Sequence, residues 1–448
     1  MSIRFVNIDR ETPMLLPVDM RDWLPKDHIV HFLIDAIQQI DLSRFKINYR
    51  GTGDEQYPPE MMLALLVYSY ITGRFGSRTI EAATYTDVAI RYICGGHAHP
   101  DHSVICAFRK DNKEVFEETF TKILVLARQM GKLKKVGGIS VDGSKFRANA
   151  SKHKAVSYKR AGEIIEELKK EVKQLLLLAE EADSKPLETG LSIPEEIKLR
   201  EERKRALERA RNEMEKMYEE ASKQKLSETG TAQPKKLEKY QYNFTDEDSR
   251  IMKAGSGKHF EQSYNAQAAV DTEGSMLIMG GYVTQNANDK KELEQVVSSV
   301  DEEVREVDTV SADTGFYSEG AVAAVEKKNE EGEREGPEVY CAVEKGHHGK
   351  TVEDLTDKGP RGRLPANLSS KEKMARKLKT KKGKNIYKKR KETVEPVFGI
   401  IKSVMGFRQF MLRGIEKVNT EWSLVRVAYN FKRLHRLMEG KSLTECLV

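Results

Sequence analysis

The chain has 448 residues, of which 39% are apolar and 33% charged, and its net charge is +6. This length accommodates two or three domains with at least one sizeable hydrophobic core. The composition is that of a globular protein with unusually many charges, which excludes a mainly disordered chain.

The cysteines and the apolar segments indicate in which cellular compartment the protein is expected. Cys94, Cys106, Cys341 and Cys446 are scattered and form no CxxC pair, so a zinc ribbon is not expected and a reducing compartment is favoured. The N-terminal residues lack the basic start and long apolar run of a secretory signal. The longest apolar stretch, 61–71, is too short to span a bilayer. We therefore expect a cytoplasmic protein without a membrane partner.

The N-terminal part has helical periodicity from residue 18 onward. We expect helices over 61–71, 79–93 and 102–108. Pro58 and Pro59 suit the start of the first of these, and Asp101 is a candidate N-cap for the last. These patterns predict an all-helical N-terminal domain over residues 1–130.

After residue 130 the pattern changes to short apolar, β-branched runs. Strands are expected over 136–141, 264–271, 276–284, 307–312 and 338–343. Helices are expected over 288–304, 320–328, 390–405 and 412–437. The resulting order β, β, β, α, β, α, β, α is that of an RNase H-like fold. We therefore expect an α/β protein whose mixed-sheet catalytic domain spans 131–155 and 241–448.

Two stretches interrupt this order. Residues 156–240 contain two amphipathic helices, expected to form an antiparallel pair joined near 186–194, where Ser192 and Glu195 resemble a capping box. The apolar stripes favour structural packing over a cofactor site, with dimerisation or DNA contact left open. Residues 345–385, rich in Gly, Lys, Ser and Pro, are expected to be a loop.

A strongly basic run lies close to the C-terminal helices. Residues 371–391 contain twelve Lys or Arg and one acid, Glu372. Such a concentration of positive charge favours contact with phosphates, although a solvated loop would have the same composition.

Three acids stand where a site is plausible. Asp142 and Asp313 follow the first and fourth expected strands, and a glycine comes soon after each, so a substrate can approach closely. The alternative is that each aspartate forms a turn or caps a helix. Glu395 lies at the border of an apolar helix face, where a carboxylate needs either a metal ion or an ion pair.

These acids are of the type that a two-metal phosphodiester site requires. The first and fourth strands of such a sheet are neighbours and the last helix crosses them, so Asp142, Asp313 and Glu395 are expected to converge. Carboxylate oxygens are preferred ligands of Mg²⁺, and two such ions activate the attacking oxygen and stabilise the leaving one. Lys402, two helical turns beyond Glu395, is a candidate for holding a phosphate.

Three further residues have side chains that could serve a function. Asp271 is interpreted as a turn residue, and Asp289 as a helix N-cap or a residue that supports a metal ligand. Trp422 is interpreted as a core or interface residue rather than one that stacks on a base.

The motifs, taken together and in order, resemble those of DDE transposases of bacterial insertion sequences, over nearly the whole chain. They are the segments 51–53, 57–59, Gly73, 77–81, 101–103, 108–109, 141–145, Asn243, 245–246, 248–252, 264–267, 287–290, 312–315 and 394–399. The relevant group has an N-terminal helical domain and a helical insertion after the first acid.

In that family the third acid lies in a pattern of Tyr, two residues, Arg, three residues, Glu, six residues and Lys. Glu395 and Lys402 fit this spacing. The Arg position falls on Lys391, with Arg390 one step away, and the Tyr position falls on Lys388, with Tyr387 one step away. The resemblance therefore implies DNA contacts for Lys402, Lys391, Arg390, Tyr387 and Lys388, although a lysine lacks the bidentate fork of arginine.

The resemblance also implies an activity. A DNA transposase of this type uses Mg²⁺, for which Mn²⁺ can substitute, held here by Asp142, Asp313 and Glu395. It cleaves the phosphodiester bond at the element ends and transfers the freed 3′-hydroxyl strand to target DNA. The implied partners are double-stranded DNA and further copies of the chain, on the bacterial nucleoid. Two alternatives remain at this point: a catalytically inactive, transposase-derived DNA-binding protein, and a general RNase H-like nuclease.

Overall fold

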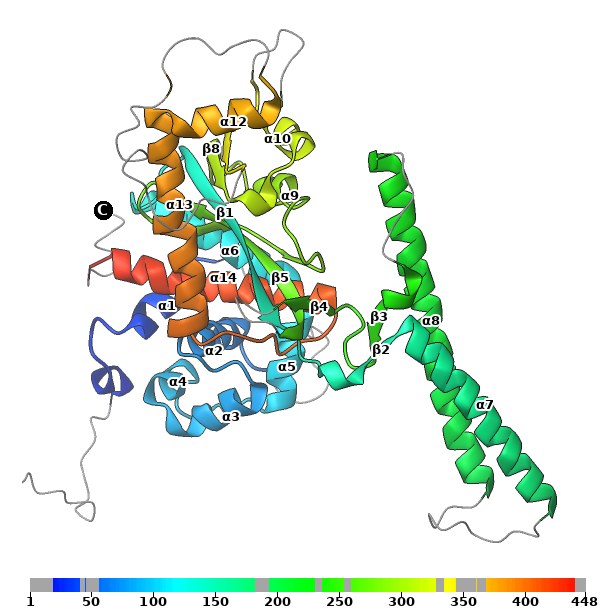
Figure 1. Cartoon of the computed structure of the whole chain (residues 1–448). Helices are drawn as coiled ribbons and strands as arrows, with labels where there is room; N and C mark the ends of the chain where they lie inside the picture. Colours follow the sequence, from blue (N-terminus) through cyan, green and yellow to red (C-terminus); the bar gives the residue numbers. More distant parts are fainter. Residues whose placement is uncertain are drawn as a thin grey trace, which may run out of the picture.

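The computed structural model describes residues 19–40, 45, 56–181, 193–229, 236–253, 259–327, 334–343, 360 and 368–439. Its N-terminal part is helical, as the periodicity predicted, and most of it lies below the sheet in Figure 1. The α-helices there are α1 (Ile29–Ile37), α2 (Pro59–Ile71), α3 (Ser77–Thr86), α4 (Val88–Ile93), α5 (His102–Asp111) and α6 (Lys113–Gln129).

The helix expected over 79–93 is two helices. Asp87 ends α3 in an extended conformation, and its side chain accepts a hydrogen bond from the Ile90 N–H, 3.1 Å away, as the N-cap of α4. Asp101 caps α5 as predicted, because its carboxylate accepts from Ser103 and Val104 N–H. An aspartate inside an apolar period can therefore end one helix and begin another.

One mixed sheet forms the centre of the molecule. Its strands are β1 (Val136–Arg147), β4 (Arg250–Lys253), β5 (Phe260–Asp271), β6 (Ile278–Gly280), β7 (Val283–Thr284), β8 (Glu306–Ala312) and β9 (Glu338–Cys341). The order is β4-β5-β1-β8-β9, with β6 and β7 also paired to β5. β5 is antiparallel to β1, whereas β1, β8 and β9 are mutually parallel. This mixed arrangement is compatible with an RNase H-like core.

Two strand predictions need correction. The first strand does not end before Asp142, because antiparallel pairing with β5 carries β1 on to Arg147. The strand expected over 276–284 is broken into β6 and β7 at Gly281, where φ is 150°. A Cβ at Gly281 would lie 2.2 Å from the carbonyl oxygen of Gln267, so only glycine fits there.

The helices of the sheet region are α9 (Leu293–Ser298), α10 (Glu319–Glu326), α12 (Ser370–Lys379), α13 (Lys381–Gly399) and α14 (Ile415–Leu437). The helix expected over 288–304 is thus reduced to α9. The expectation of a loop over 345–385 is wrong for its last part. Ser369 and Glu372 form a capping box that starts α12, and Thr380 caps α13. The remaining described residue of that stretch before 368 is residue 360.

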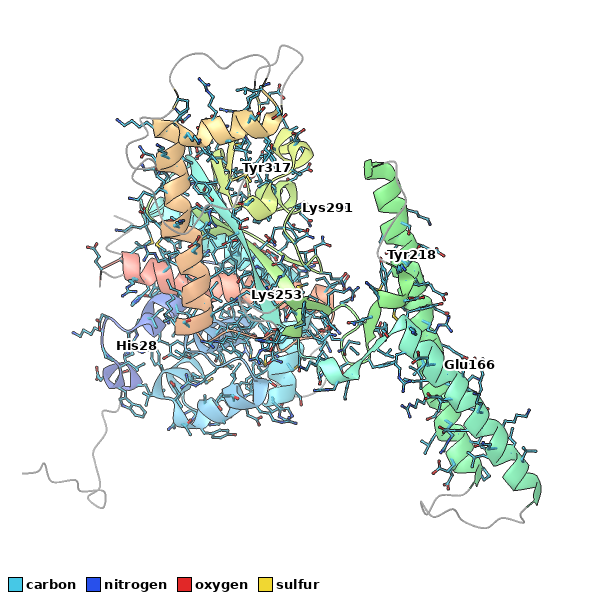
Figure 2. All side chains as sticks on the ribbon, viewed as in Figure 1. His28, Glu166, Tyr218, Lys253, Lys291 and Tyr317 are labelled. Carbon is cyan, nitrogen blue, oxygen red and sulfur yellow. The ribbon has the colours of Figure 1, made fainter. Side chains whose placement is uncertain are left out.

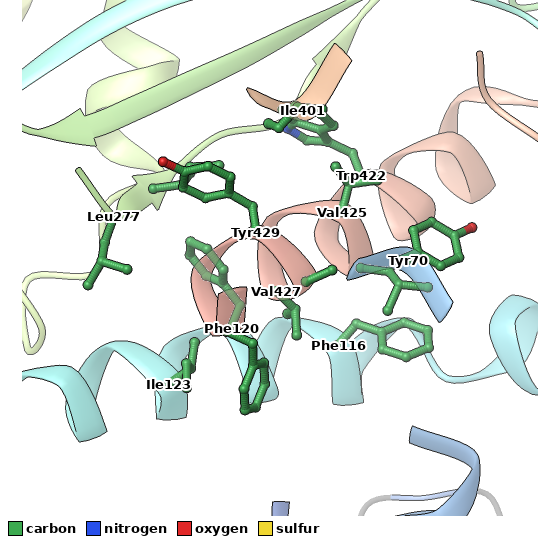
Figure 3. Packing of buried hydrophobic residues seen from close by; sticks show 14 of the residues in the cluster. Tyr70, Phe116, Phe120, Ile123, Leu277, Ile401, Trp422, Val425, Val427 and Tyr429 are labelled. Atoms are coloured by element: carbon green, nitrogen blue, oxygen red, sulfur yellow. The ribbon is translucent and has the colours of Figure 1, made fainter. Parts of the chain in front are cut away.

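The C-terminal helix α14 lies between α6 and the sheet (Figure 3). Its Trp422 is fully buried, in agreement with the core interpretation, and donates to the carbonyl of Gln267. Asn430 bonds the N–H and C=O of Ile278 in β6, and Asn419 bonds those of Val283 in β7. Side-chain amides of α14 therefore satisfy backbone groups of these two short strands.

Asp271 has a larger role than the turn interpretation gave it. It is buried at the end of β5 in an ion pair with the fully buried Arg305, and it also accepts hydrogen bonds from the N–H and hydroxyl of Ser275. The residue closes the turn after β5 and at the same time neutralises an interior arginine.

The long helices α7 (Tyr158–Glu181) and α8 (Ile193–Thr229) pack together and project from the body as an arm (Figure 1). Glu166 and Tyr218 lie on this arm, apart from the body that carries His28 and Tyr317 (Figure 2). The arm has its own apolar cluster, which includes Ile165, Leu168 and Met214. A two-stranded sheet of β2 (Ala155–Ser157) and β3 (Gln241–Asn243) closes its base. The capping box suggested at Ser192 lies outside the described residues.

No helix in the described parts of the chain combines the length and apolarity needed to cross a bilayer.

Candidate functional site

Asp142 and Asp313 come from neighbouring parallel strands. The register pairs Ser140 of β1 with Ser311 of β8, and each aspartate lies two residues further along. Because side chains alternate along extended backbone, Ser140 and Asp142 share one face, as do Ser311 and Asp313. The Ser140 and Ser311 hydroxyls are 2.8 Å apart, so both pairs share the same face.

Helix α13 covers this face and carries Glu395. Thr393, also two residues before an acid, donates its hydroxyl to Ser140 Oγ at 3.0 Å. All three hydroxyl residues are buried. The cluster Ser140–Ser311–Thr393, hereafter the hydroxyl cluster, therefore ties together the three elements that carry Asp142, Asp313 and Glu395.

The Asp142 carboxylate is in an electrostatically unfavourable position. Its burial, and secondly the nearby Asp313 carboxylate, raise the pKa of Asp142 to about 7. Arg390 and the hydrogen bond from the Gly143 N–H act in the opposite direction without cancelling this effect. A group with such a pKa at the border of a site needs additional positive charge to stay ionised at neutral pH.

Asp313 is held by the backbone that follows it. Its Oδ1 accepts from the Gly315 N–H at 2.7 Å, so the side chain caps the short 3₁₀-helix Thr314–Phe316. The helix-capping alternative thus describes one of its contacts. The thiol of Cys341 in β9 donates to the Asp313 carbonyl, and burial followed by the Asp313 charge raises the pKa of Cys341 to about 12. The thiol is therefore neutral at physiological pH.

Asp289 approaches β1 from the opposite face. Asn265 and Gln267 each donate a side-chain N–H to its Oδ1 at 2.7 Å. A Cβ at Gly143 would lie 2.5 Å from that same oxygen, so glycine is required for the close approach. The N-cap interpretation of Asp289 is wrong, because α9 begins at Leu293 with Glu292 as its N-cap.

Arg390 lies among the three acids. Its Nη2 is 2.7 Å from Glu395 Oε1, and its Nη1 is 3.6 Å from Asp142 Oδ2. Burial lowers the pKa of Arg390, but Tyr387, Asp142, Glu395 and Asp313 together raise it above its usual value. The Tyr387 ring lies 5.7 Å from the guanidinium carbon. Glu395 therefore has an arginine as its partner, which is the ion pair that the sequence offered as the alternative to a metal ion.

The other basic candidates are arranged differently. Lys388 is exposed and pairs with Glu392 at 3.2 Å, and Lys391 is exposed on the same helix. The structure therefore brings Arg390 and Tyr387 to the acids, and leaves Lys388 and Lys391 on the outer surface of α13. Helical geometry accounts for this: Tyr387, Arg390 and Val394 recur at steps of three and four residues, on the inward side.

Lys402 lies in a π-helical turn, Ile400–Val404, that follows α13. Its ammonium donates to Ser144 Oγ at 2.6 Å and to the Lys145 carbonyl at 2.9 Å, and it lies over the Phe146 ring. Burial lowers the pKa of Lys402, and Asp142 partly offsets this. Lys402 is thus bonded to β1 just beyond Asp142, on the same face of the sheet.

The three acids do not form a closed ligand set as the side chains stand. Among the residues that the structure describes, no three His, Cys, Asp or Glu side chains are grouped closely enough to hold a metal ion. The donor chemistry nevertheless fits a hard cation, because all the candidates supply carboxylate oxygens. The Asp313 charge already destabilises the ionised form of Asp142, which a divalent ion would relieve.

Away from the three acids, a hollow lies between the N-terminal helices and the end of α14. It has a volume of about 1000 Å³, and its lining includes Asp27, Tyr68, Ile71, Val404, Tyr429 and Lys432. Among the described residues that line it, Asp27 is the only acid, so these residues do not supply the paired carboxylates that metal-dependent phosphodiester chemistry needs.

Two family comparisons bear on these observations. Residues 18–111 match the family described as Transposase domain (DUF772), and residues 362–435 match the Transposase DDE domain. The second match contains Glu395, Arg390 and Lys402, whereas Asp142 and Asp313 lie outside both. A search of curated proteins and a search of solved structures each returned no match. The two matched domains, in this order along one chain, support a DDE transposase of an insertion sequence.

Proposed function

We propose that the protein cleaves phosphodiester bonds at the ends of its insertion sequence and transfers the freed 3′-hydroxyl strand to target DNA, using divalent metal ions held by Asp142, Asp313 and Glu395 in an RNase H-like core. The observation that carries this proposal is the hydroxyl cluster. It joins β1 and β8 two residues before Asp142 and Asp313, where strand geometry puts serine and aspartate on one face, and it joins both strands to α13, the helix that carries Glu395.

Asp142 and Asp313 form the part of the proposed metal site that the sheet carries. They lie on one sheet face, and the unfavourable charge of Asp142 is what a bound cation would stabilise. Magnesium suits an all-oxygen set, and Mn²⁺ has similar requirements. When bound, two such ions supply activation of the attacking oxygen and stabilisation of the leaving oxygen.

The chain's own residues would position the acids and the DNA. The hydroxyl cluster fixes how far β1, β8 and α13 are shifted along one another. Lys402, already close to Asp142, holds the end of α13 against β1 and adds positive charge beside the site. The exposed lysines of α13, among them Lys388 and Lys391, would contact the DNA backbone without reading its sequence.

Several lysines of the basic run are unsuited to this role. Lys377 and Lys382 pair with Glu338, and Lys389 pairs with Glu273. The contacts with Glu338 fasten α12 and the start of α13 to the edge strand β9, and the contact with Glu273 fastens the middle of α13 to the turn after β5. The exposed lysines proposed to contact DNA therefore lie both on α12, as Lys373 and Lys379 do, and on α13, as Lys388 and Lys391 do.

The domain roles follow the same logic. Residues 1–130 would recognise the element ends, 131–155 and 241–448 would form the catalytic domain, and the insertion 156–240 would reach toward further DNA or a second protomer. The matched transposase domain at 18–111 supports a dedicated role for the N-terminal helices.

The deciding experiment uses the full chain and a duplex taken from the DNA that flanks the coding sequence, including its inverted repeats. With Mg²⁺ we expect cleavage at the repeat and joining to a second duplex. Glu395→Gln should abolish both, whereas Glu392→Gln, an exposed acid on the same helix, should not. Strand joining that survives Glu395→Gln would contradict the proposal. Equal cutting of random DNA would favour a general nuclease, and binding without cleavage an inactive DNA-binding protein.

A further inference from the structure

Arg390 contacts the carboxylates that the proposed function assigns to metal. It donates to Glu395 Oε1 at 2.7 Å and lies 3.6 Å from Asp142 Oδ2. The Arg390 side chain is 9% exposed, whereas that of Glu395 is 45% exposed. A buried cation therefore holds the most solvent-accessible of the three acids.

This cation and a divalent ion cannot both be accommodated without cost. A guanidinium cannot lose its proton at any physiological pH, so its charge stays in the site. Like charges a few ångströms apart repel strongly where water is excluded. The oxygen of Glu395 that accepts the charge-assisted hydrogen bond is one of the two carboxylate oxygens that could coordinate a metal ion.

Arg390 also retains an unused donor. Its Nε has no hydrogen-bond partner among the described residues, although the atom is buried. Tyr387 occupies space on one side of the guanidinium, 5.7 Å from its central carbon. The planar fork of arginine matches a phosphate group in two parallel hydrogen bonds, which is more than its present contact with Glu395 supplies.

We propose that Arg390 is a positioning residue that competes with divalent metal for Glu395 and Asp142 in the DNA-free protein, and that a phosphate of the DNA backbone draws it away. This inference rests on the proposed function, because it takes the three acids as the metal ligands. It deepens that function by adding regulation: metal binds weakly until a phosphodiester strand has entered the site.

The test measures metal affinity rather than activity. Titration of the DNA-free full chain with Mn²⁺, followed by calorimetry or by the paramagnetic signal of the free ion, compares the wild type with Arg390→Gln. We expect at least about ten-fold tighter binding in the variant, since a charge-assisted contact has been removed. Lys381→Gln controls for net charge, because Lys381 is exposed at the start of the same helix.

Arg390→Lys provides a second, milder variant in case Arg390→Gln fails to fold. Lysine keeps the charge but lacks the fork that spans two carboxylates, so its Mn²⁺ affinity should exceed that of the wild type by a few-fold. Affinities for both variants that equal or fall below the wild-type value would overturn the proposal. Addition of a duplex should strengthen Mn²⁺ binding to the wild type more than to Arg390→Gln, and an equal gain would also count against it.

The failure of this inference can be told from failure of the proposed function. Asp142→Asn with Asp313→Asn should remove Mn²⁺ binding if these acids are ligands. If that double variant binds Mn²⁺ like the wild type, the proposed metal site is wrong. If it loses the metal while Arg390→Gln gains nothing, only the competition by Arg390 is wrong.

Discussion

The hydroxyls of Ser140 and Ser311 lie 2.8 Å apart, and each residue stands two positions before an acid on its own strand. Thr393 completes the arrangement from α13, the helix that also carries Glu395. The relation matters because three polar side chains in an otherwise apolar layer set the register of a helix against two strands. Apolar packing alone tolerates small shifts of a helix along a sheet, whereas hydrogen bonds between paired hydroxyls would be broken by them.

Thr393→Val tests this cluster. The substitution keeps the shape but removes the bond to Ser140 as well as that to the Lys389 carbonyl. We expect a loss of about 1 kcal/mol in the free energy of unfolding, measured by urea denaturation, and weaker Mn²⁺ binding. Thr86→Val is the matched control, because the Thr86 side chain is exposed and its hydroxyl donates to the carbonyl of Ala82, one turn earlier in α3. Equal losses in both variants, with unchanged metal binding, would contradict a positioning role.

The Asp142 pKa predicts how stability depends on pH without metal. The pKa is raised to about 7 in the fold from 3.8. Between these values the folded state binds more protons than the unfolded state, so the contribution of Asp142 to stability falls as pH rises through this window. In the presence of a chelator, we expect Asp142→Asn to be more stable than the wild type at pH 8, to have a smaller advantage at pH 5, and to approach the wild type only below the unfolded pKa of 3.8. Thermal melts at the two pH values provide the measurement, and a variant without gain at pH 8 would refute the shift.

Gly143→Ala should disturb the site from the opposite face. The added Cβ would meet Asp289 Oδ1 and Gln267 Nε2, each at 2.5 Å. We expect a loss of about 1–3 kcal/mol in unfolding free energy from overpacking, together with reduced cleavage. Gly399→Ala is the control, because nothing lies within 4 Å of the new methyl group there. Cleavage that is unaffected by Gly143→Ala would show that Asp289 can move without consequence.

The arm should be removable. Ser157 of β2 and Gln241 of β3 are paired residues of an antiparallel ladder, so an Asn-Gly turn can replace residues 158–240. Because the arm has its own apolar cluster, the body should unfold cooperatively within about 5 °C of the full chain. Calorimetry measures this directly. Aggregation or a broad, non-cooperative transition would show that the body depends on the arm.

Much of the fold was predictable because the relevant signals are local. The helical periods at α2, α7 and α8, and the β-branched run before Asp313, need no knowledge of neighbours. The extension of β1 past Asp142 was missed because it depends on pairing with β5, more than a hundred residues away. The start of α12 was missed because the Gly and Lys content of 345–385 outweighed a single capping box at Ser369 and Glu372.

The site was predictable in its acids and less so in their surroundings. Spacing selected Asp142, Asp313 and Glu395, and the structure places the elements that carry them side by side; their role as ligands remains a proposal. The position of Arg390 among them was not foreseen, because counting from Glu395 favoured Lys391. Helical phase would have corrected this, since Arg390 and Val394 lie four residues apart on the buried side.

The closed base of the arm has a consequence for the speed of folding. β1 and β5 form the central antiparallel pair, yet Arg147 and its partner Ser263 are separated by the whole insertion. Joining such distant strands is slow when the intervening chain is unstructured, because its closure entropy must be overcome first. If α7 and α8 pack together early, the pairing of β2 with β3 brings Ser157 next to Gln241. The chain that must still be closed between β1 and β5 is then only the two segments on either side of this small sheet. The insertion, once folded during synthesis, would then shorten the effective loop between β1 and β5, so that the two strands could pair nearly as fast as those of a hairpin.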